Sequence, residues 1–201
     1  MHPWFPSLCI FCAVPGSMLC SNCAESLPRA VVSPNVDHAL LSYEGATRTV
    51  VTALKYRRRW ALARPLGDAM AAIDGVASLG ANLVTWAPTS LARRRQRGAD
   101  QARALAIAVG ARLTLPVRAT LARPPGAAQT GRDVSARRQA RPFAVLGGVA
   151  GRNVILVDDV VTSGATMRGA RDALLGAGAA AVVTLALAST PSFVLRSRTP
   201  C

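Results

Sequence analysis

The segment spanning residues 153–166 constrains the fold more strongly than any other part of the chain. Four apolar residues, Val154 to Val157, lead directly into two adjacent carboxylates, Asp158 and Asp159. A turn follows, and a helix is expected to begin at Ala165. A buried strand joined in this way to a helix is typical of an open parallel sheet, whose ligand crevice lies at the carboxyl ends of the strands. We therefore expect both carboxylates at a binding site, where the strand gives way to the loop.

The turn itself carries groups that suit a phosphate. Thr162, Ser163 and Thr166 offer hydroxyl donors, and Gly164 lets the backbone approach a ligand closely. The new helix directs free N–H groups and its positive dipole end to the same place. Carboxylates for sugar hydroxyls or a metal, beside such a cradle, predict a site for a phosphorylated sugar. The alternative is that Thr162 or Ser163 only caps the helix, which leaves the two adjacent Asp unexplained.

The rest of the chain alternates short apolar runs with helical patterns. Strands are expected over residues 39–43, 83–87, 115–117, 153–157 and 181–187. Helices are expected over residues 46–58, 62–76, 99–113 and 165–175. Residues 118–141 are polar and contain Gly, Pro and many Arg, which predicts a loop or a hairpin. The alternation predicts an α/β fold with a parallel sheet flanked by helices on both faces.

Four cysteines near the start of the chain have the spacing C-x2-C-x7-C-x2-C, namely Cys9, Cys12, Cys20 and Cys23. Two such pairs place four thiolates around one ion, which predicts a structural zinc site without an open coordination position. Disulfides or a redox pair are the alternatives. Disulfides need an oxidising compartment, and no secretion signal is visible, so we expect a cytoplasmic protein. We interpret Cys201 as an exposed bystander.

The charge of the chain is concentrated in one stretch. The formal charge of the 201 residues is +14, and Arg93 to Arg141 holds twelve Arg against Asp100 and Asp133, which is +10 of that total. A basic stretch favours phosphates, nucleic acid or an acidic membrane. The Arg93–Arg97 cluster suits an anion site, a nucleic-acid contact or a solvated face. Aromatic residues are 4% of the chain and none interrupts this cluster, so single-stranded bases would lack a stacking platform there.

One apolar segment is long enough to span a bilayer. Residues 173–195 contain no charged side chain. Gly176 and Gly178 predict the end of a helix, however, and Pro191 lies in a turn-forming segment. The run between them reads as a buried strand, and we expect no membrane span.

The segment Val157–Thr166 resembles the phosphoribosyl pyrophosphate (PRPP) signature of type I phosphoribosyltransferases. Further landmarks resemble the ComF/GntX branch of double-zinc-ribbon phosphoribosyltransferase-like proteins, and together they cover nearly the whole chain. These landmarks are the four cysteines, Tyr43-Glu-Gly45, Leu54-Lys55-Tyr56, residues 87–101 with Arg93, Arg97 and Gln101, and the stretch from Arg123 through Gln129, Thr130, Arg137 and Arg138 to Phe143. The resemblance implies a zinc-ribbon module over residues 1–35 and a phosphoribosyltransferase-like domain over residues 36–201.

The resemblance also implies roles for individual residues. Asp158 and Asp159 would hold the ribose hydroxyls, in some members through Mg²⁺. Residues Thr162, Ser163, Gly164, Ala165 and Thr166 would bind the 5′-phosphate. The pyrophosphate loop would use Thr89, Ser90, Arg93 and Arg97. A mobile flap would carry Arg123, Gln129, Arg137 and Arg138. The reaction implied is displacement of pyrophosphate at ribose C1, with leaving-group charge stabilised by Mg²⁺ and Arg.

The sequence departs from the family pattern after the Arg cluster. Gly98-Ala99-Asp100-Gln101 stands where the family usually has Gly-Phe/Tyr-Asn-Gln, which predicts weaker packing or anion binding at that corner. The resemblance supplies no acceptor. Two functions follow: a phosphoribosyltransferase that uses Mg²⁺-PRPP or a related ribose phosphate, and a non-catalytic competence-type accessory that binds single-stranded DNA or partner proteins of the DNA-uptake machinery. The oligomeric state is not set by the sequence, and a homodimer is one option.

Overall fold

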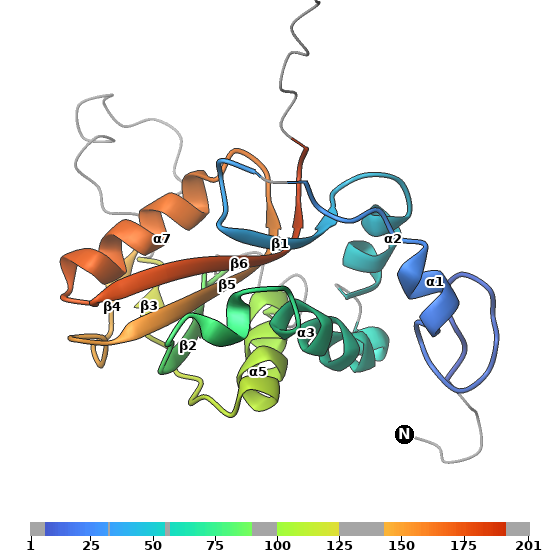
Figure 1. The fold of residues 1–201 in the computed structure, drawn as a ribbon, viewed down its shortest axis with the longest axis horizontal. Helices are drawn as coiled ribbons and strands as arrows, with labels where there is room; N and C mark the ends of the chain where they lie inside the picture. Colours follow the sequence, from blue (N-terminus) through green and yellow to red (C-terminus); the bar gives the residue numbers. More distant parts are fainter. Residues whose placement is uncertain (1–6, 32, 55–56, 90–99, 125–142, 192–201) are drawn as a thin grey trace, which may run out of the picture.

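The fold is a parallel sheet with helices on both faces and a cysteine-rich segment at one end (Figure 1). The computed structural model describes residues 7–31, 33–54, 57–89, 100–124 and 143–191. The strands are β1 (His38–Ser42), β2 (Leu83–Trp86), β3 (Leu121–Ala122), β4 (Ala144–Val145), β5 (Asn153–Val161) and β6 (Ala181–Ser189). The α-helices are α1 (Ser21–Glu25), α2 (Gly45–Leu54), α3 (Ala63–Ala71), α5 (Gln101–Leu113) and α7 (Ala165–Gly176), and the 3₁₀ helices are η1 (Arg57–Leu62) and η2 (Val76–Ser78).

The main sheet has the order β1-β6-β5-β2, and its neighbouring strands are parallel. The two longest strands, β5 and β6, form its centre and pair along their length. The edge strand β2 covers only the first half of β5, because its last residue, Trp86, pairs with Val157. The predicted parallel sheet is thus confirmed.

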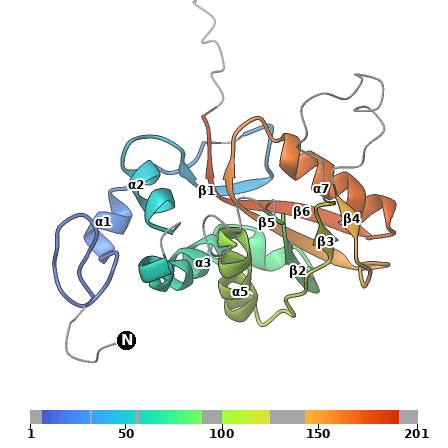
Figure 2. The ribbon, with the colours of Figure 1, turned by 180° about the vertical axis from the view of Figure 1, so that it is seen from behind.

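Alternate residues of β5 pack into two separate cores. Ile155 and Val157 point to the face covered by α2, α3 and α5, whereas Val154 and Leu156 point to the face covered by α7. Figures 1 and 2 show α3 and α5 on the side of the sheet opposite to α7. Full burial of each aliphatic side chain stabilises the fold by about 1.5–3 kcal/mol. Burial on both faces explains why this strand reads as a continuous apolar run.

Several predicted boundaries differ from the observed ones. The predicted helix over residues 62–76 is split into α3 and short 3₁₀ segments, and Gly75 adopts a left-handed conformation with φ of 86°. The predicted strand over residues 115–117 is an isolated bridge between Val84 and Val117, since Pro116 has no N–H for a ladder. The predicted helix over residues 46–58 ends at Leu54. The short strand β3 lies within the predicted loop or hairpin of residues 118–141 and pairs antiparallel with β4, which follows that segment.

The cysteine-rich segment packs on the domain core. Leu19 and Leu27 are buried in the same apolar cluster as Leu41 of β1 and Val50 of α2. The division into residues 1–35 and 36–201 stays a prediction. Across the part of the chain that the structure describes, no helix has the length and apolar character needed to traverse a bilayer.

Candidate functional site

Asp158 and Asp159 lie in the second half of β5, beyond the end of β2. They were expected where the strand gives way to a loop, but β5 continues to Val161 because β6 still pairs with it there. The last contact with the β2 side is the hydrogen bond from Ala87 N to Val157 O, at 2.9 Å. Among the described residues, no strand pairs with β5 on the β2 side beyond Val157.

The two carboxylates differ in environment. Each accepts a local hydrogen bond, Asp158 Oδ1 from the N–H of Asp159 and Asp159 Oδ1 from the N–H of Val160, both at 2.8 Å. Burial raises the pKa of Asp158 well above its ordinary value, and the neighbouring charge of Asp159 adds to this increase. A buried carboxylate beside a second one is stabilised by a cation or by hydroxyl donors, so the pair suits a sugar or a metal.

A polar pocket of about 190 Å³ opens beside this pair, and we call it the site pocket. Its wall combines residues from the loop after β2, the start of α5, the segment after β3, and the β5–α7 connection. The described lining residues are Ala87, Pro88, Thr89, Asp100, Gln101, Ala102, Arg123, Asp158, Asp159, Val160, Thr162 and Thr166. Segments that are far apart in the sequence thus meet at the carboxyl ends of β2 and β5.

The turn before α7 is left without a side-chain cap. The N-cap is Gly164, with φ of 71°, and no side chain makes a capping hydrogen bond. The alternative in which Thr162 or Ser163 only caps the helix is therefore wrong. A Cβ at Gly164 would lie 2.6 Å from Arg168 and 2.8 Å from Asn35, so only glycine fits here without a shift. All four of these hydroxyl and alanine residues are exposed, but only Thr162 and Thr166 are among the described lining residues of the site pocket, whereas Ser163 and Ala165 are not.

Asn35 braces this turn from the segment that precedes β1. Its Nδ2 donates to Thr162 O at 3.2 Å, and its Oδ1 accepts from Arg168 at 2.9 Å. The sequence analysis missed Asn35, because it lies 127 residues from Thr162 and belongs to no motif. The turn before α7 is thus held by a residue outside its own strand and helix.

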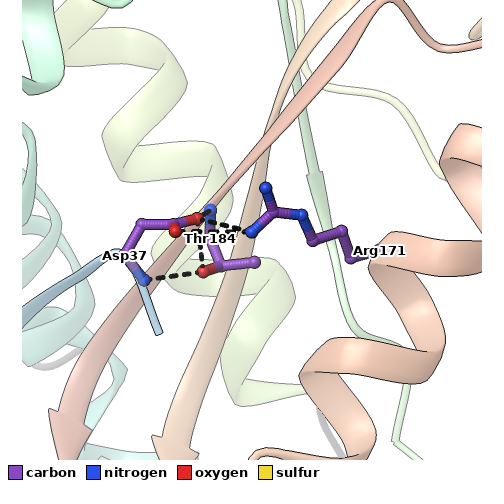
Figure 3. Close-up of polar contacts among 3 residues, drawn as sticks. All are labelled: Asp37, Arg171 and Thr184. Carbon is purple, nitrogen blue, oxygen red and sulfur yellow. Dashed lines mark hydrogen bonds and ion pairs between the residues drawn. The ribbon is translucent and has the colours of Figure 1, made fainter. Parts of the chain in front are cut away.

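Asp37 fastens the same segment to β6 and α7 (Figure 3). Its carboxylate accepts from the N–H of Thr184 at 2.8 Å, from Thr184 Oγ1 at 2.9 Å and from Arg171 at 3.2 Å. Burial acts to raise the pKa of Asp37, but the hydrogen bonds from Thr184 and the charge of Arg171 outweigh it, so the pKa lies below its ordinary value. The brace at Asn35 is therefore anchored two residues further along the chain.

Asp100 closes the α5 side of the site pocket. It is the N-cap of α5, and its carboxylate accepts from the N–H of Arg103 at 3.4 Å and from the N–H of Thr89 at 3.5 Å. Burial raises the pKa of Asp100, although those two hydrogen bonds lower it, and the charge of Asp159 raises it further. Asp100 therefore brings a third carboxylate to the pocket, next to the buried side chain of Gln101.

Arg123 connects the two sides of the pocket. Its Nε donates to Pro88 O at 2.9 Å, its NH2 group donates to Thr166 Oγ1 at 3.4 Å, and its guanidinium lies 4.8 Å from the centre of the Phe143 ring. Thr89, which the resemblance assigns to the pyrophosphate loop, also lines the pocket, and its role stays a prediction. The other predicted loop and flap residues lie outside the described residues: Ser90, Arg93, Arg97, Gln129, Arg137 and Arg138.

The four N-terminal cysteines form a second cluster. Their sulfur atoms all lie within 4.8 Å of one another, and Cys12 Sγ lies 3.6 Å from Cys20 Sγ. That separation exceeds a disulfide bond of about 2.0 Å, and it matches the roughly 3.8 Å between sulfurs around a tetrahedral ion with Zn–S bonds of about 2.3 Å. Backbone N–H groups, chiefly that of Cys12, lower the pKa of Cys9 to about 6. The donor set therefore fits a thiolate-bound metal. Cys201 lies outside the described residues.

Comparison with known proteins identifies the family. The family model called phosphoribosyl transferase domain matches residues 95–201, which is just over half of the chain. The protein therefore belongs to the phosphoribosyltransferase domain family, whose match includes β5, α7 and the Asp158–Asp159 pair. Residues 9–23, with the four cysteines, lie outside the matched range.

Several solved structures are also similar in part. An allosteric regulatory enzyme of purine biosynthesis has 23% identity and a TM-score of 0.47, over 68% of this chain and 26% of that one. A glutamine PRPP amidotransferase from B. subtilis, complexed with ADP and GMP, has 24% identity and a TM-score of 0.47, over 67% of this chain and 26% of that one. A phosphoribosylpyrophosphate synthetase from Mycobacterium smegmatis has 17% identity and a TM-score of 0.37, over 72% of this chain and 33% of that one. The chain thus spans about a quarter to a third of those proteins. No curated protein matches it.

Proposed function

We propose that the protein binds PRPP and transfers its phosphoribosyl group to an acceptor, with release of pyrophosphate. The observation that carries the proposal is the Asp158–Asp159 pair, which opens into the same small polar pocket as the turn at the start of α7. The match to the phosphoribosyltransferase domain supports it. The acceptor is left open, because no described group indicates one.

Each part of the pocket has a proposed task. Asp158 and Asp159 accept hydrogen bonds from the ribose 2′ and 3′ hydroxyls. Thr162, Thr166 and the N–H groups at the start of α7 bind the 5′-phosphate, which the positive end of the helix dipole favours. Thr89 and Arg123 face the diphosphate. In the reaction the bond between ribose C1 and the pyrophosphate oxygen breaks, the acceptor atom bonds to C1 and loses its proton, and Arg123 stabilises the negative charge on the leaving group.

Mg²⁺ suits this set of donors. Carboxylates next to a diphosphate offer the oxygen ligands that Mg²⁺ prefers. Burial and the neighbouring charge of Asp159 raise the pKa of Asp158, so a cation at the pair would stabilise its charged form. When bound with the diphosphate, Mg²⁺ would neutralise charge on the leaving group. Asp158, Asp159 and Asp100 are the described residues that would face it.

We further propose a structural zinc ion at Cys9, Cys12, Cys20 and Cys23. Four thiolates complete a tetrahedral site and leave no position for a reactive water. A metal-binding module that precedes a phosphoribosyltransferase domain supports placement in the ComF/GntX branch, because this order of parts follows the resemblance seen in the sequence. This placement is the finer part of the proposal.

Titration calorimetry with PRPP and Mg²⁺ tests the main proposal. We expect saturable binding by the wild-type protein and loss of binding in the double variant Asp158→Asn/Asp159→Asn. The matched control is Asp74→Asn/Asp172→Asn, which removes the same charge from two exposed positions and should bind normally. Unchanged affinity in the first variant would refute the assignment. A pyrophosphate-release screen with bases and amines would then identify the acceptor.

A second candidate is a non-catalytic, competence-type accessory that binds single-stranded DNA. The formal charge of +10 between Arg93 and Arg141 favours this function, because a basic stretch binds polyanions of any kind. This function predicts binding that weakens steeply with salt. A gel-shift titration without binding at low salt would exclude it.

A further inference from the structure

Gln101 carries a buried hydrogen-bond donor without a partner. The residue is 4% exposed, and its Nε2 is one of two buried side-chain atoms that lack a hydrogen bond within the described part of the chain. The other is Oγ1 of Thr47 in α2. Buried amide groups are normally paired, and an unpaired one destabilises the protein. Of these two groups, the Gln101 amide belongs to a residue that lines the site pocket, so a bound ligand could supply its missing partner.

Gln101 is the first residue of α5 and lines the site pocket. The helix has 13 residues, and of its first-turn N–H groups the side chain of Asp100 takes up that of Arg103. Ala102, the next residue, also lines the pocket. The start of α5, including Gln101, thus lines the same pocket as Asp158 and Asp159.

The position of Gln101 in the pocket indicates which part of PRPP its side chain would contact. Thr162 and Thr166 lie on the α7 side of the pocket and the Asp pair lies on β5, whereas Gln101 belongs to the α5 side together with Thr89. A diphosphate offers oxygen acceptors only, which complements an N–H donor. The nearby carboxylate of Asp100 is engaged by two backbone N–H groups, which take up part of its negative charge.

We propose that Gln101 is a binding residue whose Nε2 donates a hydrogen bond to a diphosphate oxygen of the phosphoribosyl donor. The inference rests on the proposed function and adds a specific contact to it. It also explains why a polar side chain is kept at a buried position where the free protein leaves it unpaired.

The test is the variant Gln101→Met, which keeps the length of the side chain and removes the donor. We expect affinity for PRPP and for inorganic pyrophosphate, measured by calorimetry, to fall about tenfold, the worth of one hydrogen bond to a charged group. Affinity for ribose 5-phosphate should not change. The thermal midpoint of the free protein should stay the same or rise, because an unpaired buried amide is lost. Gln101→Glu, which replaces the donor by an acceptor, should lose more affinity for pyrophosphate than Gln101→Met.

The matched control is Thr47→Val, which removes the other unpaired group and is not among the described lining residues of the site pocket. Its thermal midpoint should rise and its affinities should not change. The inference is overturned if Gln101→Met binds pyrophosphate normally, if only ribose 5-phosphate is affected, or if the variant is clearly less stable than wild type. Absence of any binding by the wild-type protein would instead refute the proposed function itself.

Discussion

The cysteine cluster and the site pocket are both indicated by short motifs, yet they are assembled in different ways. All four sulfur atoms come from residues 9–23, one pair from a turn and the other from the start of α1, where Cys20 is the N-cap. The site pocket is lined by residues between 87 and 166, and Asn35 contacts the turn that precedes α7. A local site can be disrupted without touching the sheet, whereas a site built from distant segments depends on the whole domain.

The largest effect is expected at the local site. Cys9→Ser removes a buried thiolate ligand, so zinc should be lost and the segment around Leu19 and Leu27 should become accessible to protease, because structural zinc contributes directly to folding. Metal analysis should find about one equivalent of zinc per wild-type chain. Cys201→Ser is the matched control and should keep its zinc. Well under one equivalent in wild-type protein purified without chelator would contradict the prediction.

The next largest effect concerns pH and the site pocket. Because the pKa of Asp158 is raised in the folded protein, the folded state keeps a proton that the unfolded chain releases above about pH 3.9. Stability present at low pH should therefore be lost as pH rises towards the folded pKa, by about 1.4 kcal/mol per pH unit within that window. Urea unfolding between pH 4 and 7 should show this slope in wild type. A persisting slope in Asp158→Asn would assign it to another group.

The contribution of Asp37 to stability should depend on pH in the opposite direction to that of Asp158. Its pKa is lowered in the folded protein, so its contribution is present above the unfolded pKa and is lost as pH falls through the folded value. The ion pair with Arg171 is partly exposed, with side chains 39% and 41% accessible, which limits its effect to about 1 kcal/mol. Asp37→Asn should lower the unfolding free energy more at pH 7 than at pH 3. An equal loss at both pH values would show that charge is not the cause.

The same contrast explains how far the sequence could predict the molecule. Strands β1, β2, β5 and β6 and helices α5 and α7 follow from apolar patterns, because each is buried along a regular stripe or face. Asp158, Asp159, Thr162 and Thr166 were predicted from one motif, and the structure brings them to one pocket. Arg123 was predicted only through family resemblance.

The residues that the sequence did not predict form contacts between elements that are distant in the sequence. Asn35 and Asp37 bind partners on the β5–α7 connection, β6 and α7, and their type is common in ordinary loops. The extension of β5 through the two carboxylates was also missed, because Asp is depleted in strands, and only the pairing with β6 keeps them in the sheet. Tertiary contacts, which leave no periodic signal, decide these features.

The smallest effect is expected from the loss of Asn35, which contacts the turn that precedes α7. Asn35→Ala removes the hydrogen bonds to Thr162 O and from Arg168, both at exposed positions, so the turn should become less well ordered without unfolding. We expect about threefold weaker binding of ribose 5-phosphate, the worth of part of one hydrogen bond, and no change for pyrophosphate. The matched control is Asn153→Ala, which removes a similar exposed amide bond, to Gly80 O at 3.1 Å, away from the pocket. If both variants weaken binding equally, the loss reflects general stability, and the distant brace has no specific part in holding the site.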